Sequence, residues 1–416
     1  MKKRSTKNCI PVLVIAAAVA VLFSSCGGTP GREPTGLPVT GAGTPESPAV
    51  TSAAPSPTPA ATPSEKVPIP ESWRDDGIFS DYYERAYGIL ETMSAEEKIG
   101  QMLLARRPQA NAQEFIQSAQ PGGFVLFEPD FRGRTADDVI AMLDAMQDAA
   151  RIPLIIATDE EGGSVVRISR NPFLSDHIFR SPQRLFAAGG FGAVHEDALA
   201  KAALLKKLGL NLNLAPVADV STRPGDFIYP RTLGQPAAET GDYVAAVVTA
   251  MGEMNMSSAL KHFPGYGSNS DTHTGIAVDD RPYSAFAGGD FIPFLRGIEA
   301  GAECILMSHN IVQCMDAGVP ASLSPKVHAI LRNELGFTGI ILTDDLGMGA
   351  VKKYAANEAP SVLAVLAGND MLVLSDFESA YASIREAVRS GVIPMEMIDR
   401  AVFRILSWKL ARGIMM

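Results

Sequence analysis

Residues 339–345 read GIILTDD, a continuous apolar run that ends in two adjacent aspartates. A run with no polar alternation is typical of a strand that is buried on both faces, as in a parallel sheet. The chain contains seven other runs of this kind: QMLLA (101–105), GFVLF (123–127), PLIIATD (153–159), NLNLAPVADV (211–220), SSALKHFPG (257–265), CILMSHN (304–310) and DMLVLSD (370–376). We therefore expect eight buried parallel strands.

Helical patterns separate most of these runs, for example TADDVIAMLDAMQDAA (135–150), EDALAKAALLKKLG (196–209) and SPKVHAILRNELG (324–336). Strands that alternate with helices indicate βα units. Eight such units in roughly 340 residues predict a closed (β/α)8 TIM barrel. The alternative is an open doubly wound sheet, but the glycine-rich nucleotide fingerprint expected after its first strand is missing.

Composition limits the class of partner. The chain has 416 residues, 46% of them hydrophobic, which is enough for one large core or two medium ones. Its net charge is -10, and no basic run occurs beyond the first few residues. Phosphate binding needs clustered lysine and arginine, so a nucleic-acid partner is not expected.

The first residues have the pattern of an export signal. A basic start, MKKRSTK (1–7), precedes an apolar stretch at 10–23. That stretch is shorter than the ~20 residues of a membrane span and fits the apolar region of a signal peptide. It ends in LFSSCGG (22–28), which resembles a bacterial lipobox. The resemblance implies a signal peptide at 1–25 and a lipid on Cys26, which would anchor the exported chain on the extracellular or periplasmic face of the cell membrane. Ordinary secretion with an incidental cysteine is the alternative.

The segment that follows differs in composition from the rest of the chain. Residues 26–72 are mainly Pro, Thr, Ser, Ala and Gly, cannot bury a core, and should form an extended tether. We expect a single globular domain at 73–416. Two cysteines remain in it: Cys304 lies in an apolar run and is expected in the core, and a bond to Cys314 is possible, although spacing alone cannot show it.

Ionisable residues collect where the predicted strands end. The ends carry Asp159 with Arg167 after it, Asp219, Lys261 with His262, His309, and Asp344 with Asp345. Active residues of a TIM barrel lie at the carboxyl ends of its strands, so these side chains predict a polar pocket.

A metal centre is the less favoured interpretation of this pocket. Asp271, His273, His309 and Asp344 could ligate zinc or manganese. The chain has no HxH early in the barrel and no HExxH, however, so we expect neither a metal nor another cofactor.

Several motifs, in order, carry a resemblance to a known family. They are DEEGGSVVR (159–167), NLNLAPVADV (211–220) with RTLG (231–234), KHFPGYG (261–267), DTH (271–273) and ILTDDLGM (341–348). Together they resemble glycoside hydrolase family 3, and most closely its β-N-acetylhexosaminidase branch. The similarity runs from SAEEKIGQMLL (94–104) to AGNDMLVLSD (367–376). It implies a retaining glycosidase in a TIM barrel.

The resemblance also implies residue roles. Asp344 matches the nucleophile that forms a covalent glycosyl-enzyme. The chain ends after its eighth unit, so we expect no second domain to supply the acid; the branch uses a loop Asp-His pair, which Asp271 and His273 match. An imidazole with a pKa of about 6.5 can serve as acid and base near neutrality. Asp345 should point away from the sugar, as a residue at a helix N-terminus.

Five residues match the family's binding site for the sugar whose bond is cleaved: Asp159, Arg167, Arg231, Lys261 and His262. As an alternative, Arg167 could pair with Glu160 or Glu161 on the surface. The sequence departs from the branch at Tyr266, where histidine is frequent, and in a loop about one residue shorter. Sugar preference therefore stays open.

The function that the resemblance implies is that of an exported, membrane-tethered exo-β-N-acetylglucosaminidase. Its substrates would be cell-wall muropeptides or chitooligosaccharides, and we expect a monomer. Three alternatives remain: a family 3 glycosidase for another sugar, such as a β-glucosidase; a phosphorylase, since a histidine acid does not repel phosphate; and a sugar-binding lipoprotein without turnover.

Overall fold

The computed structural model describes residues 68–269, 275–355 and 358–416. The predicted signal peptide and most of the predicted tether lie outside these residues, as do Cys26, Asp271 and His273. Within them, none of the helices combines the length and the apolar character that crossing a membrane requires.

Eight parallel strands form the centre of the domain, in the order β10-β1-β2-β3-β4-β5-β7-β9. A bridge between Leu342 and Met371 joins β9 to β10 and closes the ring. Each of the eight predicted runs contains one strand, which confirms the TIM barrel. The strands are β1 (Leu103–Arg106), β2 (Gly123–Leu126), β3 (Ile155–Thr158), β4 (Leu212–Asn213), β5 (Ser257–Phe263), β7 (Cys304–Met307), β9 (Ile340–Thr343) and β10 (Leu372–Leu374).

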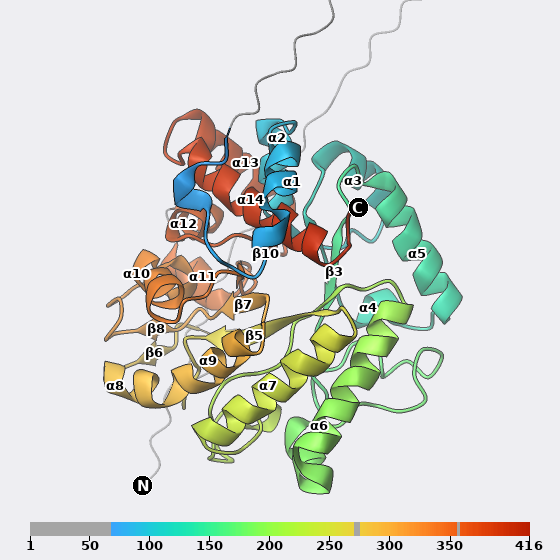
Figure 1. Cartoon of the computed structure of the whole chain (residues 1–416), viewed down its shortest axis with the longest axis vertical. Helices are drawn as coiled ribbons and strands as arrows, with labels where there is room; N and C mark the ends of the chain where they lie inside the picture. Colours follow the sequence, from blue (N-terminus) through green and yellow to red (C-terminus); the bar gives the residue numbers. More distant parts are fainter. Residues whose placement is uncertain (1–67, 270–274, 356–357) are drawn as a thin grey trace, which may run out of the picture. The chain divides into compact units, whose positions relative to one another are not determined.

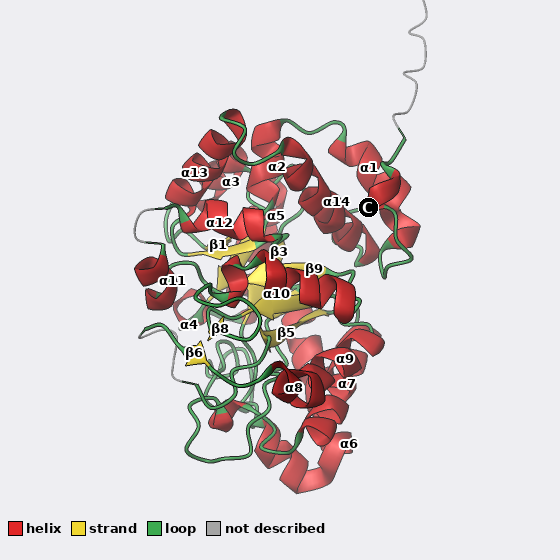
Figure 2. Ribbon diagram, turned by 90° about the vertical axis from the view of Figure 1, so that its left-hand side faces the viewer, coloured by secondary structure: helices red, strands yellow, loops and turns green. Residues whose placement is uncertain are grey.

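Helices surround the strands, as Figures 1 and 2 show. They are α1 (Tyr83–Leu90), α2 (Ala95–Gln101), α3 (Ala112–Ala119), α4 (Glu128–Phe131), α5 (Ala136–Ala149), α6 (Pro182–Lys207), α7 (Ala237–Glu253), α8 (Tyr283–Ala285), α9 (Phe291–Glu299), α10 (Pro325–Ala329), α11 (Gly349–Tyr354), α12 (Pro360–Ala367), α13 (Phe377–Arg389) and α14 (Met395–Ala411). The helix predicted at 135–150 matches α5. The one predicted at 196–209 is the last part of the longer α6, and the one at 324–336 starts as α10 and continues as a π-helix over Ile330–Glu334.

The fourth strand is shorter than its apolar run suggested. The regular ladder ends at Asn213, six residues before Asp219, where we had expected the strand to end. The interruption lies at Pro216, which has no backbone N–H to donate to the ladder. Irregular pairing with β5 nevertheless continues, because Lys261 N donates to Pro216 O at 3.2 Å and Ala218 N donates to Lys261 O at 2.6 Å. Asp219 is thereby held beside the end of β5.

Two further strands, β6 (Val278–Asp279) and β8 (Ile311–Val312), form a separate two-stranded sheet. The sequence did not predict them, since two residues carry no periodic pattern. Both cysteines in the domain are free: Cys304 is buried in β7, as expected, and Cys314 is exposed. The possible disulfide between them is therefore not formed.

A buried polar network closes the opposite end of the barrel, where the strands begin. Glu303 precedes β7 and accepts hydrogen bonds from Ser257 Oγ at 2.5 Å and from Trp408 Nε1 at 3.3 Å, and it also pairs with Arg412. These contacts attach α14 to the base of the barrel. The network lies at the end of the barrel opposite to the carboxyl ends of the strands.

Candidate active site

A cavity of about 250 Å³ opens at the carboxyl ends of the strands. It contains all five side chains predicted to bind the sugar, together with Asp344 and Asp345; apolar walls come from Phe127, Leu214, Leu306, Met348 and Val373. Typical sites for drug-sized ligands have about 300–1,000 Å³. The described part of this cavity therefore has the size of a pocket for one sugar unit rather than for a chain.

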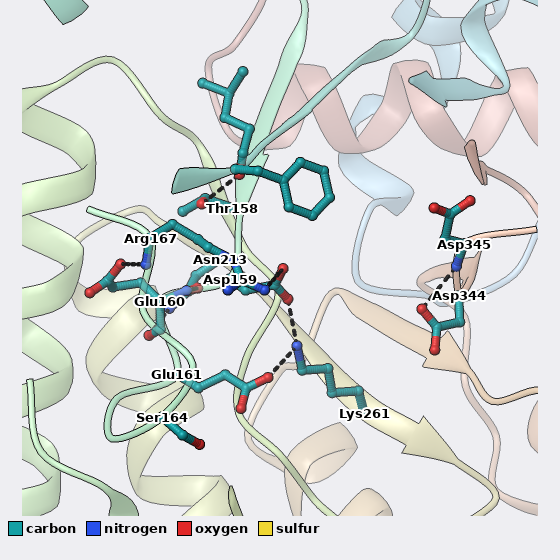
Figure 3. Close-up of polar contacts among 12 residues, drawn as sticks. Thr158, Asp159, Glu160, Glu161, Ser164, Arg167, Asn213, Lys261, Asp344 and Asp345 are labelled. Carbon is teal, nitrogen blue, oxygen red and sulfur yellow. Dashed lines mark hydrogen bonds and ion pairs between the residues drawn. The ribbon is translucent and has the colours of Figure 1, made fainter. Parts of the chain in front are cut away.

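Lys261 is the centre of the charged cluster (Figure 3). Its Nζ lies 2.7 Å from Asp159 Oδ1 and 2.6 Å from Glu161 Oε1. Only 3% of the residue is exposed. Burial alone would lower the pKa of the Lys261 ammonium, but the two carboxylates outweigh burial and raise it. Lys261 is thus a fixed, charged donor at the floor of the cavity.

Glu161 joins Lys261 to Arg231. Its carboxylate accepts from Arg231 Nε at 3.0 Å and from Arg231 Nη2 at 2.7 Å, a bidentate pair. Burial would raise the pKa of the Glu161 carboxyl, yet Lys261 and Arg231 hold it well below its usual range. Sequence reasoning considered Glu161 only as a surface partner for Arg167. The available signal was its place before Gly162 and Gly163, whose φ values of 103° and 67° turn the chain back on itself.

Arg167 does not form the side-chain pair with Glu160 or Glu161 that was considered as an alternative. Its Nη2 lies 3.5 Å from Asp159 Oδ2, and its guanidinium lies over the Phe127 ring at 5.8 Å. Glu160 instead shapes the loop, because its carboxylate accepts the backbone N–H groups of Arg167 and Ile168, each at 2.8 Å. The loop therefore presents the Arg167 side chain to the cavity.

His262 is oriented by Asp219, which is completely buried. Asp219 Oδ2 lies 2.7 Å from His262 Nδ1, and Oδ1 accepts from Tyr266 N at 2.7 Å. A carboxylate only accepts, so Nδ1 carries the proton and Nε2 is an acceptor, 3.3 Å from Arg231 Nη2. Tyr266 is 2% exposed and packs with Val217 and Ile228, outside the cavity lining.

Asp344 follows β9 directly, and its backbone N donates to Met307 O at 3.0 Å. Figure 3 shows Asp344 across the cavity from Asp159, with Lys261 between them. Asp345 holds the neighbouring turn, because its Oδ1 accepts from Gly347 N at 2.8 Å and its carboxylate also binds Ser375, after β10. The expectation that Asp345 begins a helix is wrong, because α11 begins at Gly349, after a tight turn.

His309 also differs from the expectation that it faces the pocket. It is completely buried, with Nδ1 2.7 Å from Ser322 Oγ and Nε2 3.1 Å from Asp345 O, and it does not line the cavity. Within the described ranges, no group of three or more His, Cys, Asp and Glu side chains could hold a metal ion. Asp271 and His273 belong to the residues left undescribed.

This geometry can be compared with known proteins. Residues 94–408 match the family model described as glycosyl hydrolase family 3 N terminal domain. The chain belongs to glycosyl hydrolase family 3. Family 3 members are glycoside hydrolases, so the cavity is the candidate active site of such an enzyme.

Family 3 relatives extend the comparison. The chain is 28% identical over 414 residues to the beta-hexosaminidase LpqI of Mycobacterium tuberculosis (strain ATCC 25618 / H37Rv), covering 95% of this chain and 96% of that one. It is 34% identical over 261 residues to a beta-hexosaminidase of Stenotrophomonas maltophilia (strain R551-3), covering 61% of this chain and 75% of that one.

A solved family 3 structure has the same fold. The family 3 beta-N-acetylglucosaminidase from Paenibacillus sp. str. FPU-7 superposes with a TM-score of 0.73 at 28% identity. The match covers 78% of this chain and 63% of the Paenibacillus protein, so this chain spans less than two thirds of that longer protein.

In this family 3 site, the two sides of the cavity differ in chemistry. One side presents fixed donors and acceptors from Asp159, Arg167, Lys261 and His262, which suit sugar hydroxyls. The other side presents the Asp344 carboxylate at a strand end. Glu161 and Asp219, whose supporting role the sequence did not predict, hold the donors in place. Such an arrangement can fix a sugar and bring a carboxylate to its reacting carbon.

Proposed function

We propose that this family 3 protein is a retaining exo-β-N-acetylglucosaminidase. The observation that carries the proposal is Asp344, at the end of β9, facing a cluster of hydroxyl-binding groups across a cavity of one-sugar size. The beta-hexosaminidase names of the relatives and the beta-N-acetylglucosaminidase name of the Paenibacillus protein support N-acetylglucosamine as the sugar.

The reaction would run in two steps. In the first, the Asp344 carboxylate attacks the anomeric carbon while His273 gives its proton to the leaving oxygen, so that the glycosidic bond breaks and a glycosyl–Asp344 ester forms. In the second, His273 takes a proton from water, which attacks the same carbon and releases the sugar with its β configuration retained. Asp271 would orient the His273 ring and stabilise its cation. Both loop residues enter through the resemblance alone.

The experiment that tests the activity compares two aryl glycosides, one of β-N-acetylglucosamine and one of β-glucose. The full chain, Asp344→Ala and His273→Ala are assayed side by side. We expect strong activity on the N-acetylglucosaminide that Asp344→Ala abolishes. His273→Ala should lose less on an activated phenol, because such a leaving group needs little protonation. Activity on β-glucoside alone, or sugar binding without turnover, would contradict the proposal, and product formed only with phosphate present would indicate phosphorolysis.

We also propose that Cys26 carries a lipid and that residues 26–72 tether a monomeric domain to the outer face of the membrane. The support is the lipobox pattern and the core-free composition of the segment. In membrane fractions, the wild-type chain should sediment with lipid and Cys26→Ala should be released. Equal sedimentation of both would contradict the anchor.

A further inference from the structure

A second cavity, of about 150 Å³, adjoins the candidate active site on the side of β2 and β3. Its lining includes Glu128, Arg132, Arg167, Arg170 and Phe173. Arg167 lines both cavities, so the second cavity lies directly behind the sugar-binding side of the first. The mechanism proposed above makes no use of it.

The charge of this second cavity is strongly one-sided. Its lining has three arginines and one carboxylate, in a chain whose net charge is -10, and Asp159 of the first cavity lies 3.5 Å from the Nη2 atom of one of them, Arg167. Arg132 and Glu128 neutralise each other through hydrogen bonds of 2.8 and 2.5 Å. The hydrogen bond from Arg132, followed by the charges of Arg132, Arg170 and Arg167, lowers the pKa of Glu128.

Two arginines of the cavity have hydrogen-bond donors that the described residues do not use. Arg170 gives one hydrogen bond, from Nη2 to Ser164 O at 3.1 Å, and forms no ion pair with any carboxylate of the described residues. Arg167 Nε is buried and has no hydrogen-bond partner among those residues. Planar guanidinium groups match phosphate and carboxylate oxygens in particular.

The position of the cavity decides which part of a substrate it would meet. The anomeric carbon has to lie against Asp344, and Figure 3 shows Arg167 and Asp159 on the opposite side of Lys261 from Asp344. In a pyranose, C4 and its neighbour substituent C6 lie farthest from C1. The groups on C4 and C6 therefore face Arg167 and the cavity behind it, whereas the leaving group, on C1, does not.

We propose that the arginine-lined cavity is a subsite for an anionic substituent, a phosphate or carboxylate, on C4 or C6 of the terminal β-N-acetylglucosamine unit. This inference rests on the proposed function, because it uses the orientation of the sugar against Asp344. Arg170 is its specificity-determining residue, and Phe173, 65% exposed, forms its rim.

Calorimetric titration of the full chain with N-acetylglucosamine and with its 4-phosphate and 6-phosphate tests the subsite. At least one phosphate should bind about 10–100-fold more tightly than the unsubstituted sugar, the gain of charge-assisted hydrogen bonds. Arg170→Gln should remove this gain and leave the affinity for N-acetylglucosamine unchanged. Arg389→Gln is the matched control: Arg389 is an exposed arginine as well, but it lies at the end of α13, where it pairs with Glu386. It should retain the gain.

Three results would overturn the inference: neither phosphate binds more tightly, the gain survives in Arg170→Gln, or Arg389→Gln loses it as well. The inference would also be overturned if Arg170→Gln weakened the binding only of an aryl β-N-acetylglucosaminide whose phenol carries a carboxylate. The cavity would then bind the leaving group. Hydrolysis of the neutral aryl N-acetylglucosaminide by the same preparation keeps the two proposals apart. Its absence contradicts the proposed function, whereas normal hydrolysis without phosphate discrimination contradicts the subsite alone.

Discussion

Glu161→Gln tests whether the charged groups that hold Lys261 and Arg231 in place affect the rate, because it leaves the proposed nucleophile, Asp344, unchanged. The variant keeps the size of the side chain and removes the carboxylate charge. In the wild type, Glu161 Oε1 lies 2.6 Å from Lys261 Nζ and 2.7 Å from Arg231 Nη2. Lys261 keeps Asp159 as its remaining carboxylate, while Arg231 loses its bidentate partner. Lys261 would then keep one acid partner, and Arg231 would keep none among the ion pairs of the described residues.

The expected magnitude follows from burial. Glu161 is 4% exposed, and breaking a buried ion pair costs about 3–5 kcal/mol. An unfolding entropy of about 2.1 cal/mol/K per residue gives roughly 0.7 kcal/mol/K for about 350 residues, so the melting temperature should fall by about 4–7 °C. A shift of about 1 Å in sugar-contacting groups can cost ~100-fold in rate, so kcat/KM should fall by about 10–100-fold.

The assay measures thermal unfolding and kcat/KM on an aryl β-N-acetylglucosaminide at 25 °C. Glu303→Gln is the matched control, since Glu303 is also a buried glutamate paired with an arginine, at the other end of the barrel. We expect loss of kcat/KM only in Glu161→Gln; Glu303→Gln should destabilise the protein less, because burial raises the pKa of Glu303 whereas Lys261 and Arg231 lower that of Glu161. Wild-type kcat/KM in Glu161→Gln would refute the positioning role. An equal loss in both variants would attribute the effect to stability alone.

Three further predictions concern the same framework. Burial lowers the pKa of the Lys409 ammonium to about 7, so between pH 7 and 10.5 the unfolded state binds more protons than the folded state, and the free energy of unfolding rises with pH. In chemical denaturation from pH 6 to pH 9.5, the difference in unfolding free energy between Lys409→Met and wild type should therefore shift by about 3 kcal/mol in favour of wild type, and parallel pH profiles would contradict this. Gly265→Ala should lower stability by about 1–3 kcal/mol, because φ is +121° and a Cβ would overlap the Asp290 carboxylate; an unchanged melting temperature would argue against this. Asp345→Asn should lower kcat less than tenfold, because the Asp345 carboxylate binds Ser375 rather than the sugar. A loss of kcat as large as that of Asp344→Ala would instead identify Asp345 as the nucleophile.

The strands were predictable because burial on both faces leaves a continuous apolar run in the sequence. All eight runs contain a strand, and their ends bring Asp159, Lys261, His262 and Asp344 to one cavity. Prediction failed where local chemistry interrupts the pattern. Pro216 ends the β4 ladder early, and a turn between Asp345 and α11 separates that residue from the helix it was expected to begin.

The supporting acids of the site could not be predicted in the same way. Carboxylates are mostly exposed in proteins, so Glu161 was considered only as a surface residue, and Asp219 was placed at a strand end without the supporting role that it has. Their burial depends on partners that are distant along the chain: Glu161 pairs with Arg231, 70 residues away, and Asp219 with His262, 43 residues away. Only the closed barrel brings these residues together. The same holds for the arginine-lined cavity, whose side chains come from the loops after β2 and β3.

The proposed mechanism requires a covalent intermediate on Asp344, which mass spectrometry of the digested protein can detect and locate. The protein is incubated with a slow β-N-acetylglucosaminyl substrate that carries fluorine at C5, quenched at low pH and digested. We expect a mass increase of one fluorinated N-acetylglucosaminyl unit, located on Asp344 and absent from Asp344→Ala. An adduct on Asp345 or any other residue, or substrate turnover without an adduct, would contradict it.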